Sequence, residues 1–148
     1  KYKKETGSAV KLVLIGSTIL KIPSHHDIVY LGFLPEQDKF DAIDGAVLLA
    51  MPSFYESLSM VTLEAWAMGK PVLANARCEV LQGQCLRSRG GLYYADYAEF
   101  REALDLLLNT PRLREAMGLN GRKYYRGNYT WEKIEDKYLG IIRGLEGG

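Results

Sequence analysis

The segment Pro52–Pro71 reads P-S-F-Y-E-S-L-S-M-V-T-L-E-A-W-A-M-G-K-P, and it predicts the loop and helix around which the rest of the chain is arranged. Proline and serine after an apolar run favour a turn, and a helix is expected from about Ser57 to Met68. Gly69 ends this helix, and Pro71 prevents its continuation. The segment therefore predicts a loop and a helix between two strands.

The expected helix carries a carboxylate that needs a partner. Between residues 58 and 68 the polar side chains are Ser59, Thr62 and Glu64, so most of the helix surface is expected to be buried. Burial of Glu64 is unfavourable without a hydrogen bond, and no Lys or Arg lies one helical turn away. Glu56 precedes the first turn, where free backbone N–H groups and the helix dipole favour an anion. Seven residues separate the two carboxylates.

The pattern Glu56-x7-Glu64, followed by A-W-A-M-G-K-P-V, resembles the E-x7-E signature of retaining GT-B glycosyltransferases, in particular family 4 (group 1). In that family the pattern runs roughly P-S-x-x-E-G-F-G-x-x-x-L-E-A-M-A-x-G-x-P-V-V-A, and the match extends over residues 52–74. The resemblance implies that Glu56 is the catalytic residue facing the donor sugar, and that Glu64 binds the ribose hydroxyls of a nucleotide sugar. One carboxylate holds a diol well, because each charge-assisted hydrogen bond contributes about 1.5–3 kcal/mol.

The resemblance implies further donor-binding residues, which follow Glu56 or end the first two expected strands: Ser57, Leu58, Ser59, Gly16, Phe33 and Leu34. Gly16 is expected near the nucleotide, and Phe33 and Leu34 beside the base. Plain packing is the alternative for Phe33 and Leu34, since apolar side chains usually belong to the core.

Two serines depart from the family pattern, which has glycine at both positions. Glycine permits close backbone approach to a ligand. Ser57 and Ser59 therefore indicate either a different donor specificity or, for Ser57, a helix cap. After the next strand, Arg77 is either an exposed loop residue or one that approaches a phosphate. Glu79 is either a structural hydrogen-bond acceptor or a residue that faces the donor pocket.

Apolar runs alternate with helical segments along the chain. Five runs are expected strands, the first of them buried on both faces: residues 10–17, 28–34, 46–51, 71–75 and 90–94. Strands that alternate with helices over short connections predict an α/β fold with a Rossmann-like doubly wound parallel sheet and helices on both faces. Its ligand site lies beyond the carboxyl ends of the strands. We expect one domain over residues 1–148, corresponding to the C-terminal half of a GT-B fold.

Helices dominate the chain from Tyr97 onward. Thr110 and Pro111 are an N-cap and a first helical residue, and a last helix is expected from about Thr130. Its apolar stripe is expected to face inward: Trp131, Ile134, Tyr138, Ile141 and Leu145. The Y-T-W-E-x-I sequence resembles the carboxyl end of the family, where the final helix returns towards the partner domain.

Composition excludes several classes of protein. A net charge of +1 argues against a broad cationic face, so no nucleic-acid partner is expected. The sequence contains no run of about eighteen apolar residues, so it predicts no membrane span. Its first residues show no signal-peptide pattern. Cys78 and Cys85 lack zinc-site spacing and are interpreted as reduced thiols. We expect a cytoplasmic protein, with any peripheral membrane contact made by parts of the enzyme outside this sequence.

Motifs for cofactors and metals are missing from the expected places. Neither G-x-G-x-x-G nor G-x-x-x-x-G-K-S/T follows the first strand, which argues against dehydrogenases and P-loop proteins. Asp41 and Asp44 do not form D-x-D, and the family needs no metal. His25 and His26 are expected as solvated loop residues, without a carboxylate or Cys at ligand spacing. We expect no cofactor and no metal, with a UDP- or GDP-sugar as the donor substrate.

The family has one more strand, which carries an Arg and a Lys that neutralise the diphosphate, and an acceptor domain before it. We interpret the sequence as a fragment without that strand and that domain, inactive by itself, from an enzyme that transfers sugar to a glycan or a lipid-linked acceptor. The alternative is a noncatalytic α/β protein-association module in which a neighbouring side chain bonds Glu64. A sugar-nucleotide epimerase matches the motif less well.

Overall fold

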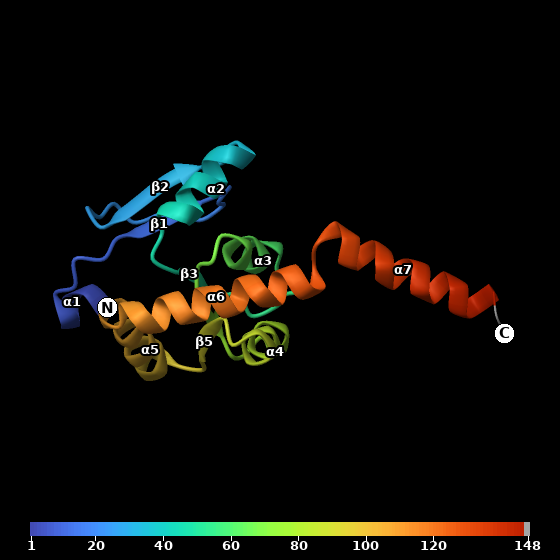
Figure 1. The fold of residues 1–148 in the computed structure, drawn as a ribbon. Coiled ribbons are helices and arrows are strands. Elements are labelled where there is room, and N and C mark those ends of the chain that lie inside the picture. The colour runs from blue at the N-terminus through green and yellow to red at the C-terminus, as the bar shows by residue number, and fades with distance from the viewer. Residues whose placement is uncertain (147–148) are drawn as a thin grey trace. The chain divides into compact units, whose positions relative to one another are not determined.

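The computed structural model describes residues 1–146 and contains two compact units, an N-terminal unit of residues 1–42 and a C-terminal unit from residue 43 onward (Figure 1). The N-terminal unit contains α1 (Tyr2–Thr6), β1 (Leu12–Ile15) and β2 (Ile28–Gly32). Helix α2 (Glu36–Gly45) leads from one unit into the other. Strands β1 and β2 pair in parallel.

The first strand differs from its expected environment. Leu12 and Val13 are each 48% exposed, so the expectation of burial on both faces is wrong. Within the described residues, β2 is the one strand that pairs with β1. A two-stranded sheet leaves much of its apolar surface uncovered, which accounts for the exposure.

The C-terminal unit alternates strands and helices as the sequence predicts. Its elements are β3 (Leu49–Met51), α3 (Met60–Ala67), β4 (Val72–Asn75), α4 (Glu79–Ser88), β5 (Gly91–Tyr94), α5 (Tyr97–Asn109), α6 (Pro111–Asn128) and α7 (Trp131–Glu146). The strands form a parallel sheet in the order β3-β4-β5, and every residue of the central strand β4 is buried. Parallel sheets flanked by helices confirm the α/β fold class, although the five strands are divided between two sheets.

Trp66 lies at the centre of the core in this unit. Its side chain is 0% exposed, and its indole Nε1–H donates to the carbonyl of Gly90 at 2.9 Å. Helix α6 packs against α3 because glycine faces the indole ring: a Cβ at Gly121 would lie 2.1 Å from Trp66 Cδ1. Tyr124 meets the same indole edge-on, with 5.7 Å between the ring centroids.

Helix α7 differs from its expected position. Its apolar stripe is exposed except at the half-buried Ile134, with Trp131 at 80% and Leu145 at 79%, so the prediction that this stripe faces inward is wrong. Figure 1 shows α7 extending beyond the end of α6, which is the element it contacts. No neighbouring element of the described chain therefore covers this stripe. None of the helices described combines the length and the apolar character needed to cross a membrane.

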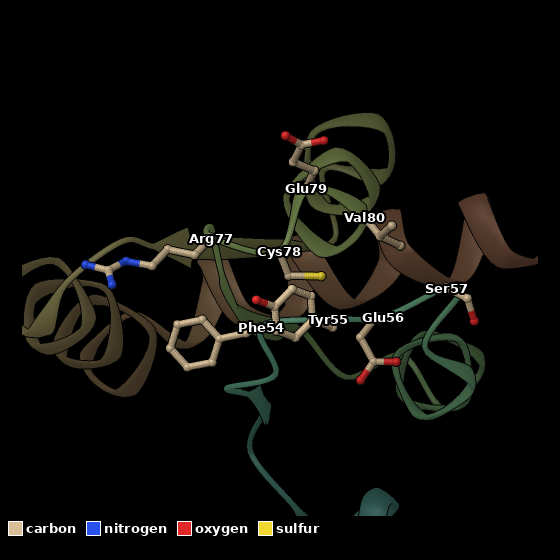
Figure 2. Close-up of a pocket in the computed structure, with 8 residues that line it drawn as sticks. All are labelled: Phe54, Tyr55, Glu56, Ser57, Arg77, Cys78, Glu79 and Val80. Atoms are coloured by element: carbon tan, nitrogen blue, oxygen red, sulfur yellow. The ribbon is translucent and has the colours of Figure 1, made fainter.

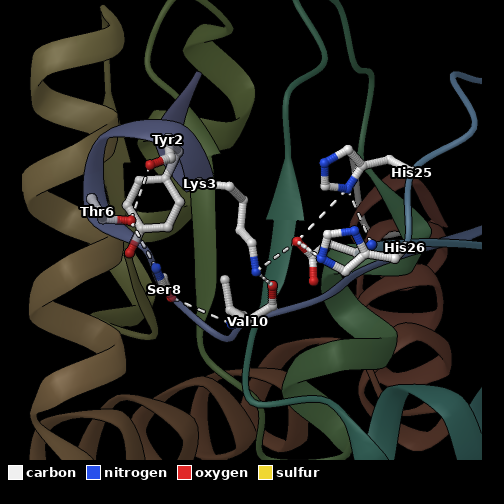
Figure 3. A network of polar contacts seen from close by, with 8 residues as sticks. Tyr2, Lys3, Thr6, Ser8, Val10, His25 and His26 are labelled. Atoms are coloured by element: carbon white, nitrogen blue, oxygen red, sulfur yellow. Dashed lines mark hydrogen bonds and ion pairs between the residues drawn. The ribbon is translucent and has the colours of Figure 1, made fainter.

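A polar network joins α1 to the beginnings of β1 and β2 (Figure 3). Lys3 Nζ donates to the carbonyl of Val10 at 2.7 Å and lies 3.0 Å from Asp27 Oδ2. The same carboxylate oxygen lies 3.2 Å from His26 Nε2 and 3.7 Å from His25 Nδ1. The hydrogen bond from Lys3 holds the pKa of Asp27 below its ordinary value, against the opposing effect of burial, and the two histidines add to the lowering.

We expect Gly121→Ala to destabilise the C-terminal unit by about 1–3 kcal/mol or more, because the added methyl group overlaps a buried indole that has no room to move. Gly127→Ala in the same helix is the control, since a Cβ there meets nothing within 4 Å and should stabilise the helix by about 0.5–1 kcal/mol. Urea unfolding of both variants measures the difference. Equal stabilities would contradict the packing described for Trp66.

We expect Lys3→Met to raise the pKa of Asp27 towards the ordinary value of about 3.9, measured by NMR titration of the carboxyl group. The pKa of Asp27 is lower in the folded protein than in the unfolded chain. The carboxylate therefore stabilises the fold fully when the pH is above the ordinary pKa. This contribution is lost as the pH falls through the folded-state pKa. Lys4→Met is the control, because Lys4 is exposed. An unchanged Asp27 titration in Lys3→Met would refute the pairing.

Candidate functional site

A hollow of about 530 Å³ lies at the carboxyl ends of β3 and β4. Its lining comes from the loop after β3 and the turn after β4: Phe54, Tyr55, Glu56, Ser57, Arg77, Cys78, Glu79 and Val80 (Figure 2). Neighbouring parallel strands end at the same edge of a sheet, which brings these two segments together. The sheet thus places Glu56 opposite a second group of side chains that follows β4.

The loop that carries Glu56 is longer than expected. Helix α3 begins at Met60, with Ser59 as its N-cap residue, so the expected start at Ser57 and the cap by Ser57 are wrong. Ser59 has φ 56°, in the left-handed region that favours glycine, and the family pattern has glycine at this position. Its buried hydroxyl lies 3.0 Å from Thr62 Oγ1. This contact supports a conformation that is unfavourable for a residue with a Cβ.

Arg77 is a lining residue of the hollow, and its guanidinium lies at the edge away from Glu56. Its Nε–H donates to the carbonyl of Ala95 at 3.1 Å, and no carboxylate pairs with its guanidinium within residues 1–146. Glu56 and Arg77 project in opposite directions in Figure 2. Carboxylates accept hydrogen bonds from hydroxyl groups, and a guanidinium donates to anions such as phosphate. Glu56 therefore suits the hydroxyl groups of a ligand in the hollow, and Arg77 offers a cation at its edge.

Two aromatic side chains of the Glu56 loop add apolar surface to the hollow. Tyr55 is 94% exposed and Phe54 is 55% exposed, and both line the hollow. Aromatic rings provide an apolar face against which a ring-shaped ligand can pack. The sequence pattern did not predict Phe54 and Tyr55 as site residues, and it did not predict Cys78 and Val80 on the other side of the hollow. Their position directly after two parallel strands was the available signal.

Glu64 lies on α3, half-buried, and does not line the hollow that contains Glu56. Leu58, 36% exposed, and the buried Ser59 are also outside it. The structure therefore brings together Glu56 and Ser57 from the predicted set. The roles assigned to all members of this set, Glu56 and Ser57 included, remain predictions.

The remaining predicted residues belong to the N-terminal unit. Gly16 has φ 116°, and its N–H donates to the carbonyl of Gly32 at 2.7 Å, while its own carbonyl accepts from the Tyr30 hydroxyl at 3.0 Å. Phe33 is 82% exposed, so plain packing does not explain it. Leu34 is half-buried.

Both cysteines are free thiols, in agreement with the interpretation of their spacing, and the structure shows that both are buried. Burial raises the pKa of the Cys85 thiol to about 12, which keeps it protonated and unreactive at neutral pH. The expectation that no carboxylate lies at ligand spacing from His25 and His26 is wrong, because one ligand atom from each histidine and from Asp27 lies within 4.8 Å of the others. The ammonium of Lys3 already contacts that carboxylate and would repel a metal ion.

Comparisons with known proteins agree with this fold. The family described as "Glycosyl transferases group 1" matches residues 1–110. Among solved structures, sucrose-phosphate synthase from Thermosynechococcus elongatus has a TM-score of 0.71 and 26% identity, over 82% of this chain and 31% of the other. WaaG, a glycosyltransferase involved in lipopolysaccharide biosynthesis, has a TM-score of 0.64 and 16% identity, over 92% of this chain and 48% of the other.

Curated relatives point the same way. A GDP-mannose-dependent monoacylated alpha-(1-6)-phosphatidylinositol monomannoside mannosyltransferase from Corynebacterium glutamicum is 28% identical over 79% of this chain and 32% of its own length. An MMP alpha-(1->4)-mannosyltransferase from Mycolicibacterium hassiacum is 31% identical over 78% of this chain and 29% of its own length. The chain thus spans about a third of the length of these relatives. Because the family match covers well over half of the sequence, the chain belongs to the group 1 glycosyl transferases.

Proposed function

We propose that this chain forms the nucleotide-sugar-binding part of a retaining glycosyltransferase, which transfers a sugar from a nucleoside diphosphate to a glycan or a lipid-linked acceptor. The observation that carries the proposal is the position of Glu56 in the hollow at the carboxyl ends of β3 and β4. Ligands of open α/β sheets bind at this edge. The family membership supports the reaction class.

Each carboxylate has a separate role in this proposal. Glu56 accepts hydrogen bonds from the sugar hydroxyls and stabilises the positive charge that develops at the anomeric carbon during transfer. Glu64 binds the ribose, and the hydroxyl of Ser57 contributes a weaker, neutral contact to the sugar. Phe33, with its exposed ring, lies beside the base. No metal is assigned a role.

The donor is a UDP- or GDP-sugar in this proposal, and GDP-mannose is the donor named for one relative. We infer that the 148 residues do not transfer sugar by themselves, since they span about a third of their relatives. The acceptor-binding domain of the family would supply the rest of the active site. We place the enzyme in the cytoplasm, where nucleotide sugars are available.

The proposal is tested by calorimetric titration of the chain with UDP, GDP, ADP, UDP-glucose, GDP-mannose and ADP-glucose. We expect the chain to prefer one base. Glu64→Ala should weaken the binding of both the nucleotide and the nucleotide sugar by about tenfold or more, because one charge-assisted hydrogen bond is lost. Glu56→Gln should weaken the nucleotide sugar and leave the nucleotide unchanged. Glu115→Gln, on the exposed surface of α6, is the matched control.

Flat titrations with every nucleotide and sugar would count against the donor-binding role. The alternative is the noncatalytic association module, and one observation favours it: the exposed apolar stripe of α7, which includes Trp131 and Leu145. It predicts that the substitutions at Glu56 and Glu64 leave nucleotide binding unaffected, and that Trp131→Ala alters association measured by sedimentation.

A further inference from the structure

Two buried carboxamide side chains bind the backbone of the Glu56 loop on either side of Glu56. Asn75, at the end of β4, donates from Nδ2 to the carbonyl of Pro52 at 3.1 Å. Gln84, on α4, donates from Nε2 to the carbonyl of Leu58 at 2.7 Å. Asn75 is 4% exposed and Gln84 is 1% exposed. The loop is therefore attached near both of its ends to elements that form the other wall of the hollow.

Asn75 connects both walls through one side chain. While its Nδ2 binds Pro52, its Oδ1 accepts a hydrogen bond from the backbone N–H of Arg77 at 3.0 Å. Pro52 precedes the lining residues of one segment, and Arg77 is a lining residue of the other. The Asn75 side chain thus links the two segments directly, in addition to the pairing of β3 with β4 and the bond from Gln84.

The amide group of Gln84 also binds the loop, although this leaves its other polar atom without a partner in the described part of the chain. Its Oε1 is buried and has no hydrogen-bond partner among residues 1–146. The opposite orientation of the amide would bring two carbonyl oxygens together at Leu58, so the observed orientation is fixed by the loop. A buried acceptor without a partner is unfavourable, and an apolar side chain of equal length would avoid it. A carboxamide here is explained by its bond to the loop.

We propose that Asn75 and Gln84 act as a carboxamide clamp, a pair of positioning residues that holds loop 52–59 in the conformation in which Glu56 lines the hollow. The loop needs such support because it enters α3 through Ser59 in the left-handed region. A carboxylate that is held in place before the ligand arrives binds it more tightly than one on a mobile loop. The part of this inference that concerns ligand binding rests on the proposed function.

Gln84→Met tests the clamp, since methionine keeps the length and volume of glutamine and removes both polar atoms. We expect unchanged or higher thermal stability, because the unpaired Oε1 is gone. The NMR order parameters of the backbone amides of residues 53–59 should nevertheless fall towards about 0.6, while those of β4 and α6 stay near about 0.85. Gln82→Met is the matched control, because Gln82 lies on the same helix and its side chain has no hydrogen bond to any residue of the described range 1–146.

Asn75→Asp separates the two bonds of the other residue. The carboxylate still accepts from the N–H of Arg77 and loses the donor to Pro52. Lower order parameters confined to the Glu56 loop are the expected result. Wild-type order parameters in that loop for both Gln84→Met and Asn75→Asp overturn the proposal. A general fall of the order parameters in Gln84→Met also overturns it, because Gln84 would then serve the core as a whole.

Ligand binding supplies a second readout. Gln84→Met should lower the affinity for the preferred nucleotide sugar by about tenfold. The affinity for the corresponding nucleoside diphosphate should change by less than about twofold. Glu56→Gln should add little in that background, because both changes remove the same contact. Full additivity contradicts the clamp. If the wild-type chain binds no nucleotide, the proposed function fails, and the order parameters of the loop still decide whether the clamp exists.

Discussion

The burial of Trp66 is the constraint on which the rest of the C-terminal unit depends. Its indole occupies the space between α3 and α6, and its N–H bond to Gly90 links α3 to the residue before β5. Gly121 allows α6 to approach the ring. Helix α3 is thereby fixed against the sheet, and the loop that precedes α3 has one fixed end. The position of Glu56 follows from a packing interaction ten residues further along the chain.

The loop itself is a balance between backbone strain and side-chain hydrogen bonds. Ser59 adopts a conformation that a Cβ disfavours, and its buried hydroxyl is paired with Thr62. Asn75 and Gln84 bind the carbonyl groups of Pro52 and Leu58. A glycine at position 59 would remove the strain and also remove the contact with Thr62. This chain holds the loop with side chains where the family pattern uses backbone freedom.

Much of this architecture could be predicted from the sequence. The five apolar runs became five parallel strands, and the motif around Glu56 identified the family. Helix α4 followed only from the alternation of strands and helices, because Gly83 and two neighbouring glutamines interrupt its own apolar periodicity. The start of α3 was placed too early because nothing in the letters S-L-S indicates a left-handed residue.

The predictions that β1 and α7 are buried were wrong for a different reason. Periodicity shows which face of α7 is apolar, and it predicts burial only where some element covers that face. Trp131 and Leu145 are exposed because no described element does so. The same reasoning applies to Leu12 in β1, an apolar strand residue in a two-stranded sheet. Sequence patterns identify apolar surfaces reliably, and contacts between elements decide whether they are buried.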